Sequence, residues 1–273
     1  MVALSISRAW DESKAIFARD GRLLVAVALA LVVLPTVIVG LVVPSDPAGG
    51  GGLVGGLVQT AAALIAMIGQ LALIRLALGP ATTVGAAIAH GLRRFPSLLG
   101  AMILLVLAIF LLMIPIVLIL AAAGLVDLEN QARTLTGPAA AIIGLAVIAI
   151  IAVAVRFLLT APVASAEAAG PITILKRSWA LTSGHYWRLL GFLVLILILA
   201  IVLMLAAGAI GGVLGTILSP GLEVFSLGAL VLALFVGIAQ GVFTVLTSVM
   251  VARIYLQLLG RDSIDVTVPK TGT

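Results

Sequence analysis

The chain has 273 residues, of which 63% are hydrophobic and only 9% are charged. Soluble domains are about 45–50% apolar and about 25% charged, so 15 basic and 10 acidic residues cannot cover a water-facing surface here. Composition therefore excludes a soluble globular protein, a disordered chain and a nucleic-acid binder, despite an isoelectric point near 10.4, and indicates an integral membrane protein.

Six stretches are long and apolar enough to cross a bilayer, whose hydrocarbon core needs about 20 residues of helix. In chain order they are 23–43, 53–74, 98–124, 138–155, 189–218 and 225–252. Each is apolar all round, as in lipid-embedded helices. We expect kinks at Pro35 and Pro115, which lie inside the first and third spans. The predicted fold is all-α, a polytopic bundle of six transmembrane helices.

The charged residues divide unevenly between the two sides of these spans. Segments 1–22, 75–97, 156–188 and 253–273 hold 14 of the 15 Lys and Arg residues, whereas the three intervening short loops hold only Arg133. Basic loops stay in the cytoplasm, so we expect both termini to be cytoplasmic. We expect no cleavable signal peptide, because acidic residues lie among the first 22 and the apolar run that follows is too long.

The sequence also suggests an internal repeat. Three tandem units, 1–79, 80–165 and 166–261, would each contain an amphipathic helix and two spans, and residues 262–273 would form a short cytoplasmic tail. Arg75, Arg156 and Arg253 recur at the inner end of the second span of each unit. Two spans per unit give all units the same orientation, so the symmetry axis would run along the membrane normal.

The amphipathic segments carry an apolar stripe opposite a charged face. The stripe residues are Ile6, Trp10, Ser13 and Phe17 in the first segment, and Ile172, Leu175, Trp179 and Thr182 in the third. Such helices lie in the headgroup plane, so we predict that Trp10, Trp179 and Trp187 are interfacial anchors. The alternative is a helix that packs under the bundle.

Residues 162–188 resemble a known bacterial family. The motif residues are Pro162, Glu167, Gly170-Pro171, Lys176-Arg177-Ser178-Trp179 and Thr182-x-Gly184-x-x-Trp187-Arg188. This pattern is similar to the membrane domain of glycerophosphoryl diester phosphodiesterases and its stand-alone six-span relatives. The resemblance implies a module of the bacterial inner membrane. In the two-part proteins the phosphodiester chemistry belongs to a separate soluble barrel, so the resemblance implies no such activity for this chain.

The residues themselves suggest no catalytic, metal or cofactor site. The chain has no cysteine, and neither His90 nor His185 has an acidic residue within four positions. The spans hold no central carboxylate of the kind that proton-coupled carriers use. The glycine-rich stretch 49–56 lacks the Lys-Ser/Thr of a phosphate loop, and we interpret its Gly pairs, like those among 208–215, as helix contacts. We therefore expect a protein that is not an enzyme.

One basic surface is a candidate binding site. Its predicted residues are Arg75, Arg156, Arg253, Glu167, Lys176, Arg177 and Arg188. If the three units surround one axis, three arginines would converge on an anionic lipid headgroup; the alternative is ordinary snorkelling of arginines at span ends. The hypothesis is a module that binds or organises anionic lipids, or a scaffold for other membrane proteins or for itself. A second hypothesis is a lipid or small-solute transporter with a path lined by Gln59, Gln70 and Gln240.

Overall fold

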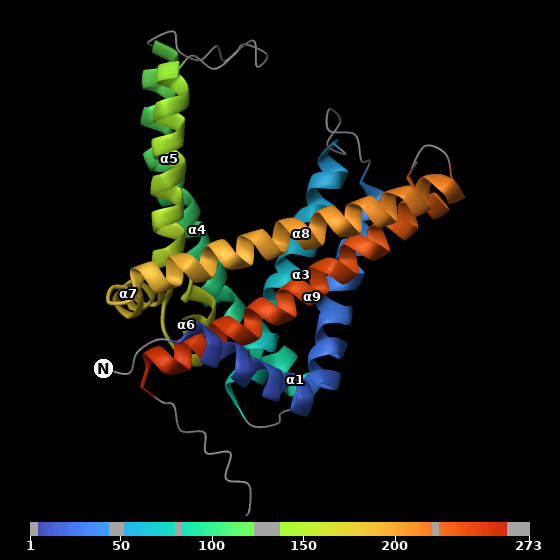
Figure 1. Cartoon of the computed structure of the whole chain (residues 1–273), viewed down its shortest axis with the longest axis horizontal. Coiled ribbons are helices and arrows are strands. Elements are labelled where there is room, and N and C mark those ends of the chain that lie inside the picture. The colour runs from blue at the N-terminus through green and yellow to red at the C-terminus, as the bar shows by residue number, and fades with distance from the viewer. Residues whose placement is uncertain (1–4, 44–51, 80–82, 123–136, 220–223, 261–273) are drawn as a thin grey trace, which may run out of the picture. The chain divides into compact units, whose positions relative to one another are not determined.

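The computed structural model describes residues 5–43, 52–79, 83–122, 137–219 and 224–260, and every element in these ranges is a helix. The elements are α1 (Ile6–Ala28), the π-helical turn η1 (Leu29–Val33), α2 (Leu34–Val42), α3 (Gly52–Leu78), α4 (Val84–Ala122), α5 (Gly137–Arg156), α6 (Thr160–Ala166), α7 (Pro171–Thr182), α8 (Tyr186–Leu218) and α9 (Leu227–Leu258). Figure 1 shows their course. Six helices are long and apolar enough to cross a membrane, which confirms the all-α class and the six spans.

The helices begin earlier than the predicted spans. The first membrane-spanning helix runs without a break over Ile6–Val42 and the third over Val84–Ala122, so two amphipathic segments continue directly into their spans. The third segment differs, because α7 is separated from α8 by the residues Ser183–His185. At the first two junctions the continuous helix satisfies its own backbone N–H and C=O groups. At the third junction the Ser183-Gly184 turn interrupts the helix.

Pro35 distorts its helix, as the sequence predicts. The π-helical turn η1 ends two residues before Pro35, and the Thr36 hydroxyl donates to the carbonyl oxygen of Val32 at 2.7 Å. Since proline has no N–H, one hydrogen bond of the α-helical ladder is lost before it, and here a π-helical turn accommodates that loss. In contrast, α4 continues as an α-helix past both Pro96 and Pro115.

The chain divides into two compact units, which do not follow the predicted repeat. The first unit comprises residues 1–93 and 194–273, and the second comprises residues 94–193. Both boundaries therefore fall inside long helices, α4 and α8. The division into two units reflects which residues contact one another, not which segments are similar to one another. The three-unit repeat therefore stays a prediction.

In the first unit, α9 is the central helix, and α1, η1, α2 and α3 pack against it. α9 runs antiparallel to α1 and α2: the Ser5 N–H donates to Gln257 Oε1 at 3.2 Å, and the Phe225 N–H donates to the Leu41 carbonyl at 3.2 Å. Small residues of α9 allow this close packing. A Cβ at Gly237 would lie 3.3 Å from the Val33 carbonyl oxygen.

The predicted glycine contacts are only partly correct. A Cβ at Gly211 would lie 3.0 Å from Phe235 Cβ, so this glycine does make a close helix contact. Gly56, Gly208 and Gly212 have no neighbouring atom within 4 Å of such a position in the part of the chain that is described. A small residue permits close approach but does not cause it, and among the described residues close approaches occur at other glycines, such as Gly241 on α9 and Gly91 on α4.

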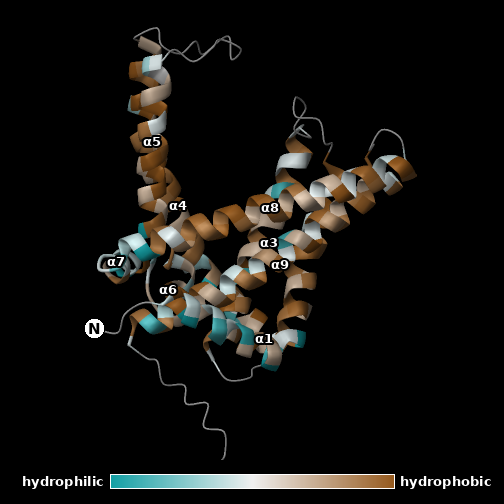
Figure 2. Ribbon diagram, viewed as in Figure 1, coloured by the Kyte–Doolittle hydropathy of each residue, from teal (hydrophilic) through white to brown (hydrophobic). Residues whose placement is uncertain are grey.

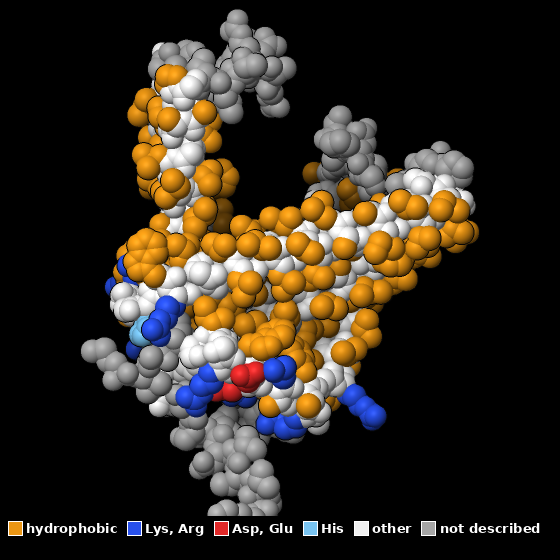
Figure 3. Space-filling view, in the orientation of Figure 1, with side chains coloured by type: hydrophobic (Ala, Val, Ile, Leu, Met, Phe, Trp, Pro, Cys, Tyr) orange, Lys and Arg blue, Asp and Glu red, His pale blue; other side chains and the backbone are white. Residues whose placement is uncertain are grey.

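The surface matches a lipid environment. Polar residues gather on α1 and α7, whereas α4, α5 and α8 are hydrophobic along most of their length (Figure 2). Figure 3 shows acidic and basic side chains next to one another on α1. Two ion pairs of α1 are Arg8 with Glu12 at 3.0 Å and Lys14 with Asp11 at 2.7 Å. The protein is a membrane protein with six helices able to span the bilayer.

Candidate functional site

Arg156, the last residue of α5, lies against two aromatic rings in the second unit. Its guanidinium carbon is 4.9 Å from the ring centroid of Trp179 on α7 and 5.4 Å from that of Tyr186 at the start of α8. Phe157 packs against the same indole with a centroid distance of 5.8 Å. A cation within about 6 Å of an aromatic face is attracted to it, so the two rings hold the guanidinium in place.

Two hydroxyl groups fix the backbone at the same position. Ser178 Oγ donates to the Arg156 carbonyl oxygen at 3.0 Å, and Thr182 Oγ1 donates to it at 3.2 Å. The last four carbonyls of a helix lack intrahelical partners, and these hydroxyls supply them for Arg156. Ser178 and Thr182 are both buried and lie four residues apart on one face of α7. α7 is thereby attached to the end of α5.

The Arg156 guanidinium has an unused donor. Its Nη1 is buried and has no hydrogen-bond partner among the described residues. The acidic residue of the same segment, Glu167, instead pairs with Arg177, whose Nε lies 3.2 Å from Glu167 Oε1. A buried N–H without an acceptor is costly, and an anionic oxygen would satisfy it. No solvent reaches this nitrogen in the structure, so an anionic oxygen could contact it only after the surrounding side chains move.

The other predicted cations of this segment lie on the outside. Lys176, Arg177 and Arg188 are exposed, and so are the predicted anchors Trp10, Trp179 and Trp187, with 43%, 48% and 79% of their surface accessible. These indoles are free to contact lipid, but whether they do so stays a prediction.

The packed face of α7 differs from the predicted apolar stripe. Ile174, Ser178 and Thr182 are buried, whereas Ile172 and Trp179 are exposed. The reason is that α7 packs against α5 and α6 through its small hydroxyl residues. The large apolar residues Ile172 and Trp179 thus mark the exposed surface of α7 and not the surface that packs against α5 and α6.

Arg75 and Arg253 belong to the first unit. Both are half-buried, and Arg253 Nε has no hydrogen-bond partner among the described residues. The helix that carries Arg253, α9, packs against α1. The structure thus brings Arg253 together with α1 and Arg156 together with Trp179 and Tyr186. Convergence of all three arginines stays a prediction.

Of the residues of the transport hypothesis, Gln59 is exposed, and Gln70 and Gln240 are half-buried. None of the three lines the apolar groove between α1 and α9. A transport path lined by them stays a prediction. His185 is half-buried, and no group of three His, Asp or Glu side chains that could hold a metal ion occurs in the described ranges.

Sequence reasoning missed the contact of Tyr186 with Arg156. It also missed the hydroxyl contacts of Ser178 and Thr182 with the Arg156 carbonyl. One signal pointed to them: three of the residues that contact Arg156, namely Ser178, Trp179 and Thr182, belong to the motif in residues 162–188.

Comparison with known proteins gives a family without an assigned function. No curated protein matches the chain, and no solved structure matches it. The resemblance to the phosphodiesterase membrane domain thus stays a prediction. One family model, described as a domain of unknown function (DUF7847), matches residues 4–258. Since that range includes all six spans, the chain belongs to the DUF7847 family.

Proposed function

We propose that the protein is a non-enzymatic membrane module that binds anionic lipid headgroups at Arg156. The observation that carries the proposal is the half-buried Arg156 beside two aromatic rings, whose Nη1 has no acceptor among the described residues and becomes available to an anion when the side chains around it move. Trp179 and Tyr186 hold the guanidinium in place, so little side-chain entropy is lost when an anion binds. Hydrogen bonds between guanidinium and phosphate are charge-assisted and strong.

The neighbouring residues fit a headgroup better than a soluble anion. Trp179 and Ile172 expose apolar surface beside the site, which suits the lipid interface. Lys176 and Arg177 add positive charge on the same helix, and the charge pattern of the chain predicts that this segment faces the cytoplasm. The proposed ligand is therefore an anionic lipid of the cytoplasmic leaflet.

Replacing Arg156 with glutamine tests the proposal. Native mass spectrometry of the delipidated full chain, titrated with phosphatidylglycerol, measures the fraction that retains lipid. A charge-assisted hydrogen bond contributes about 1.5–3 kcal/mol, so Arg156→Gln is expected to weaken retention at this site by about tenfold or more. Diacylglycerol, which has no phosphate, should bind equally to both proteins.

Arg93→Gln is the matched control, because it removes the same guanidinium charge from an exposed position on α4 that is not part of the proposed site. We expect it to leave retention nearly unchanged, since exposed charges interact weakly with their surroundings. Equal losses in the two variants would mean that net charge, not Arg156, attracts the lipid. Unchanged retention in Arg156→Gln would refute the site.

The orientation is a separate prediction with its own measurement. If the basic segments are cytoplasmic, a reporter fused after Ser45 and one fused at the C-terminal end must lie in opposite compartments. Fusions to alkaline phosphatase and green fluorescent protein distinguish the compartments, because each is active on only one side of a bacterial inner membrane. Two reporters in the same compartment would contradict the orientation and the leaflet assigned to the headgroup.

A further inference from the structure

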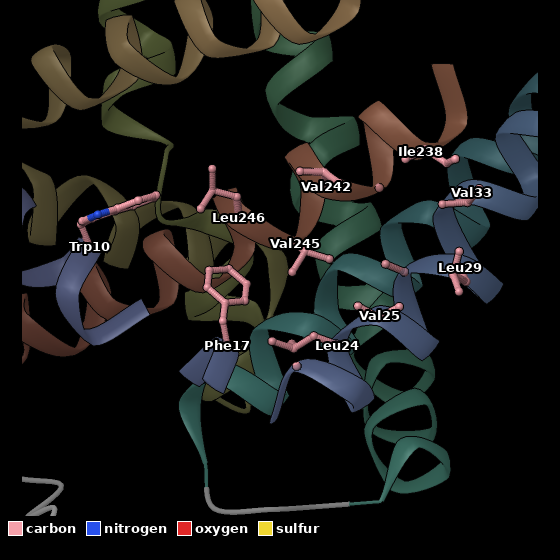
Figure 4. Close-up of a pocket in the computed structure, with 13 residues that line it drawn as sticks. Trp10, Phe17, Leu24, Val25, Leu29, Val33, Ile238, Val242, Val245 and Leu246 are labelled. Atoms are coloured by element: carbon pink, nitrogen blue, oxygen red, sulfur yellow. The ribbon is translucent and has the colours of Figure 1, made fainter. Parts of the chain in front are cut away.

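An apolar groove of about 610 Å³ lies between α1 and α9 in the first unit. Phe17, Leu24 and Val25 line it from α1, Val33 from η1, and Val242 and Val245 from α9. Figure 4 shows Phe17 pointing toward Val245 and Leu246 across the groove. Its volume is that of a small-molecule site, which is usually about 300–1,000 Å³.

One glycine leaves the groove open on α1. Gly21 lines its wall, and a Cβ there would have no other atom within 4 Å, so the space beside this residue is open. Gly241 on α9 also lines the wall, but a Cβ there would lie 2.7 Å from Val33 Cγ2, so this glycine allows close packing instead. A larger residue at Gly21 would occupy the groove with protein atoms.

The groove crosses the predicted membrane boundary and runs into the hydrocarbon region. Its lining on α1 and η1 extends from Trp10 to Val33, and the first predicted span starts at Leu23. The ten residue steps from Leu23 to Val33 extend about 15 Å at 1.5 Å per residue. Half of a hydrocarbon core is about 15 Å thick. The part of the groove inside the predicted span thus has the length of one acyl chain in one leaflet.

A cation, Arg22, follows Gly21 of the groove wall in the sequence, near the predicted level of the lipid headgroups. Arg22 is exposed and is three residues before Val25, so the two share one side of α1. Arg22 forms no hydrogen bond or ion pair within the described ranges, in contrast to Arg8, Lys14 and Arg19 on the same helix. A phosphate ester next to an apolar tail complements this arrangement.

We propose that the α1–α9 groove holds one acyl chain of a membrane phospholipid, and that Arg22 binds its phosphate. A transmembrane helix of a partner is about 10 Å wide and exceeds a groove of this volume, whereas a single acyl chain fits it. The site does not use Arg156, so this proposal and the proposed headgroup site can fail separately.

Photocrosslinking tests the tail. The full chain is reconstituted in phosphatidylcholine vesicles that contain a small share of phosphatidylglycerol with a diazirine midway along one acyl chain. Illumination followed by peptide mapping should give crosslinks on α1–η1 residues 24–33. Gly21→Leu, whose Cβ would meet no atom within 4 Å and whose longer side chain would enter the groove, is expected to reduce this yield by about tenfold.

Gly85→Leu is the matched control, because Gly85 also lies in a helix and has open space beside it but does not line the groove. It should leave the crosslinks unchanged, as should Arg156→Gln. Equal yields in Gly21→Leu and Gly85→Leu would show contact with bulk lipid and overturn the proposal. The proposal also fails if the unaltered chain gives no crosslinks on residues 24–33.

The headgroup is tested with a diacylglycerol that carries the same diazirine and lacks the phosphate. Its yield in the groove should be about tenfold lower than that of phosphatidylglycerol, and Arg22→Gln should remove the difference. Arg93→Gln, which removes an exposed charge from α4, should preserve it. Equal crosslinking of both lipids by the unaltered protein would overturn the role of Arg22 and the assignment of a phospholipid.

Discussion

Replacing Gly91 with alanine is expected to lower the thermal unfolding temperature of the detergent-solubilised protein by about 3–10 °C. Gly91 is buried on α4. A Cβ there would lie 2.7 Å from the Ile68 carbonyl oxygen and 3.4 Å from the Ala72 amide nitrogen on α3. Both are backbone atoms, so no side chain can rotate away, and the helices must separate. Overpacking of this kind costs about 1–3 kcal/mol.

Gly85→Ala is the control for this prediction. Gly85 lies six residues earlier on α4, and a Cβ there would meet no atom within 4 Å. Alanine favours the helix over glycine by about 1 kcal/mol, so this variant should unfold at the same temperature or slightly higher. A fall of equal size in both variants, measured by differential scanning fluorimetry, would disprove close packing of α4 on α3 at Gly91.

The second large effect is expected from removing the two hydroxyls that hold α7. Ser178→Ala combined with Thr182→Val leaves the Arg156 carbonyl without its two donors. An unsatisfied buried acceptor costs about 1–3 kcal/mol, so local opening of α7 should increase by about tenfold. Trypsin cleavage after Lys176 and Arg177, followed over time by mass spectrometry, should accelerate by the same factor.

Ser183→Ala is the matched control here, because the exposed Ser183 hydroxyl donates to Ala180 within the end of α7. Its removal should change the cleavage rate less than twofold, about 0.4 kcal/mol or below. If the double variant were cleaved no faster than Ser183→Ala, the hydroxyl contacts would not hold α7 to α5. Lipid retention at Arg156 should fall in the double variant, since Trp179 moves with α7.

The sequence was sufficient to predict the spans because hydropathy and helix length obey one strong constraint. Every backbone group in a bilayer must be satisfied within its own segment, and the six predicted stretches all coincide with long helices. Their starts were less predictable. The helices Ile6–Val42 and Val84–Ala122 each join a polar, amphipathic section to an apolar span without a break. Hydropathy locates the apolar span but does not show whether the helix continues into the polar section.

The site was predictable as a segment but not as a geometry. Motif residues drew attention to 162–188, whereas the partner of Trp179 is Arg156, 23 residues earlier in the chain. The short helix α6 lies between them and brings α7 back to the end of α5. Contacts of this kind depend on how a chain reverses direction. The close packing at Gly91 was not predicted for a similar reason. A larger residue is excluded there only because the backbone of α3 lies next to this position.

The π-helical turn η1 has a consequence for alignment along the first membrane helix. A π turn contains one residue more than an α turn, and each residue rotates a helix by about 100°. Past this extra residue, Val37 and Gly40 of α2 meet Gly237 and Ala233 of α9. A homologue lacking one residue in 29–33 would present a different flank of α2 to α9. Deletions there should consequently be rarer than substitutions.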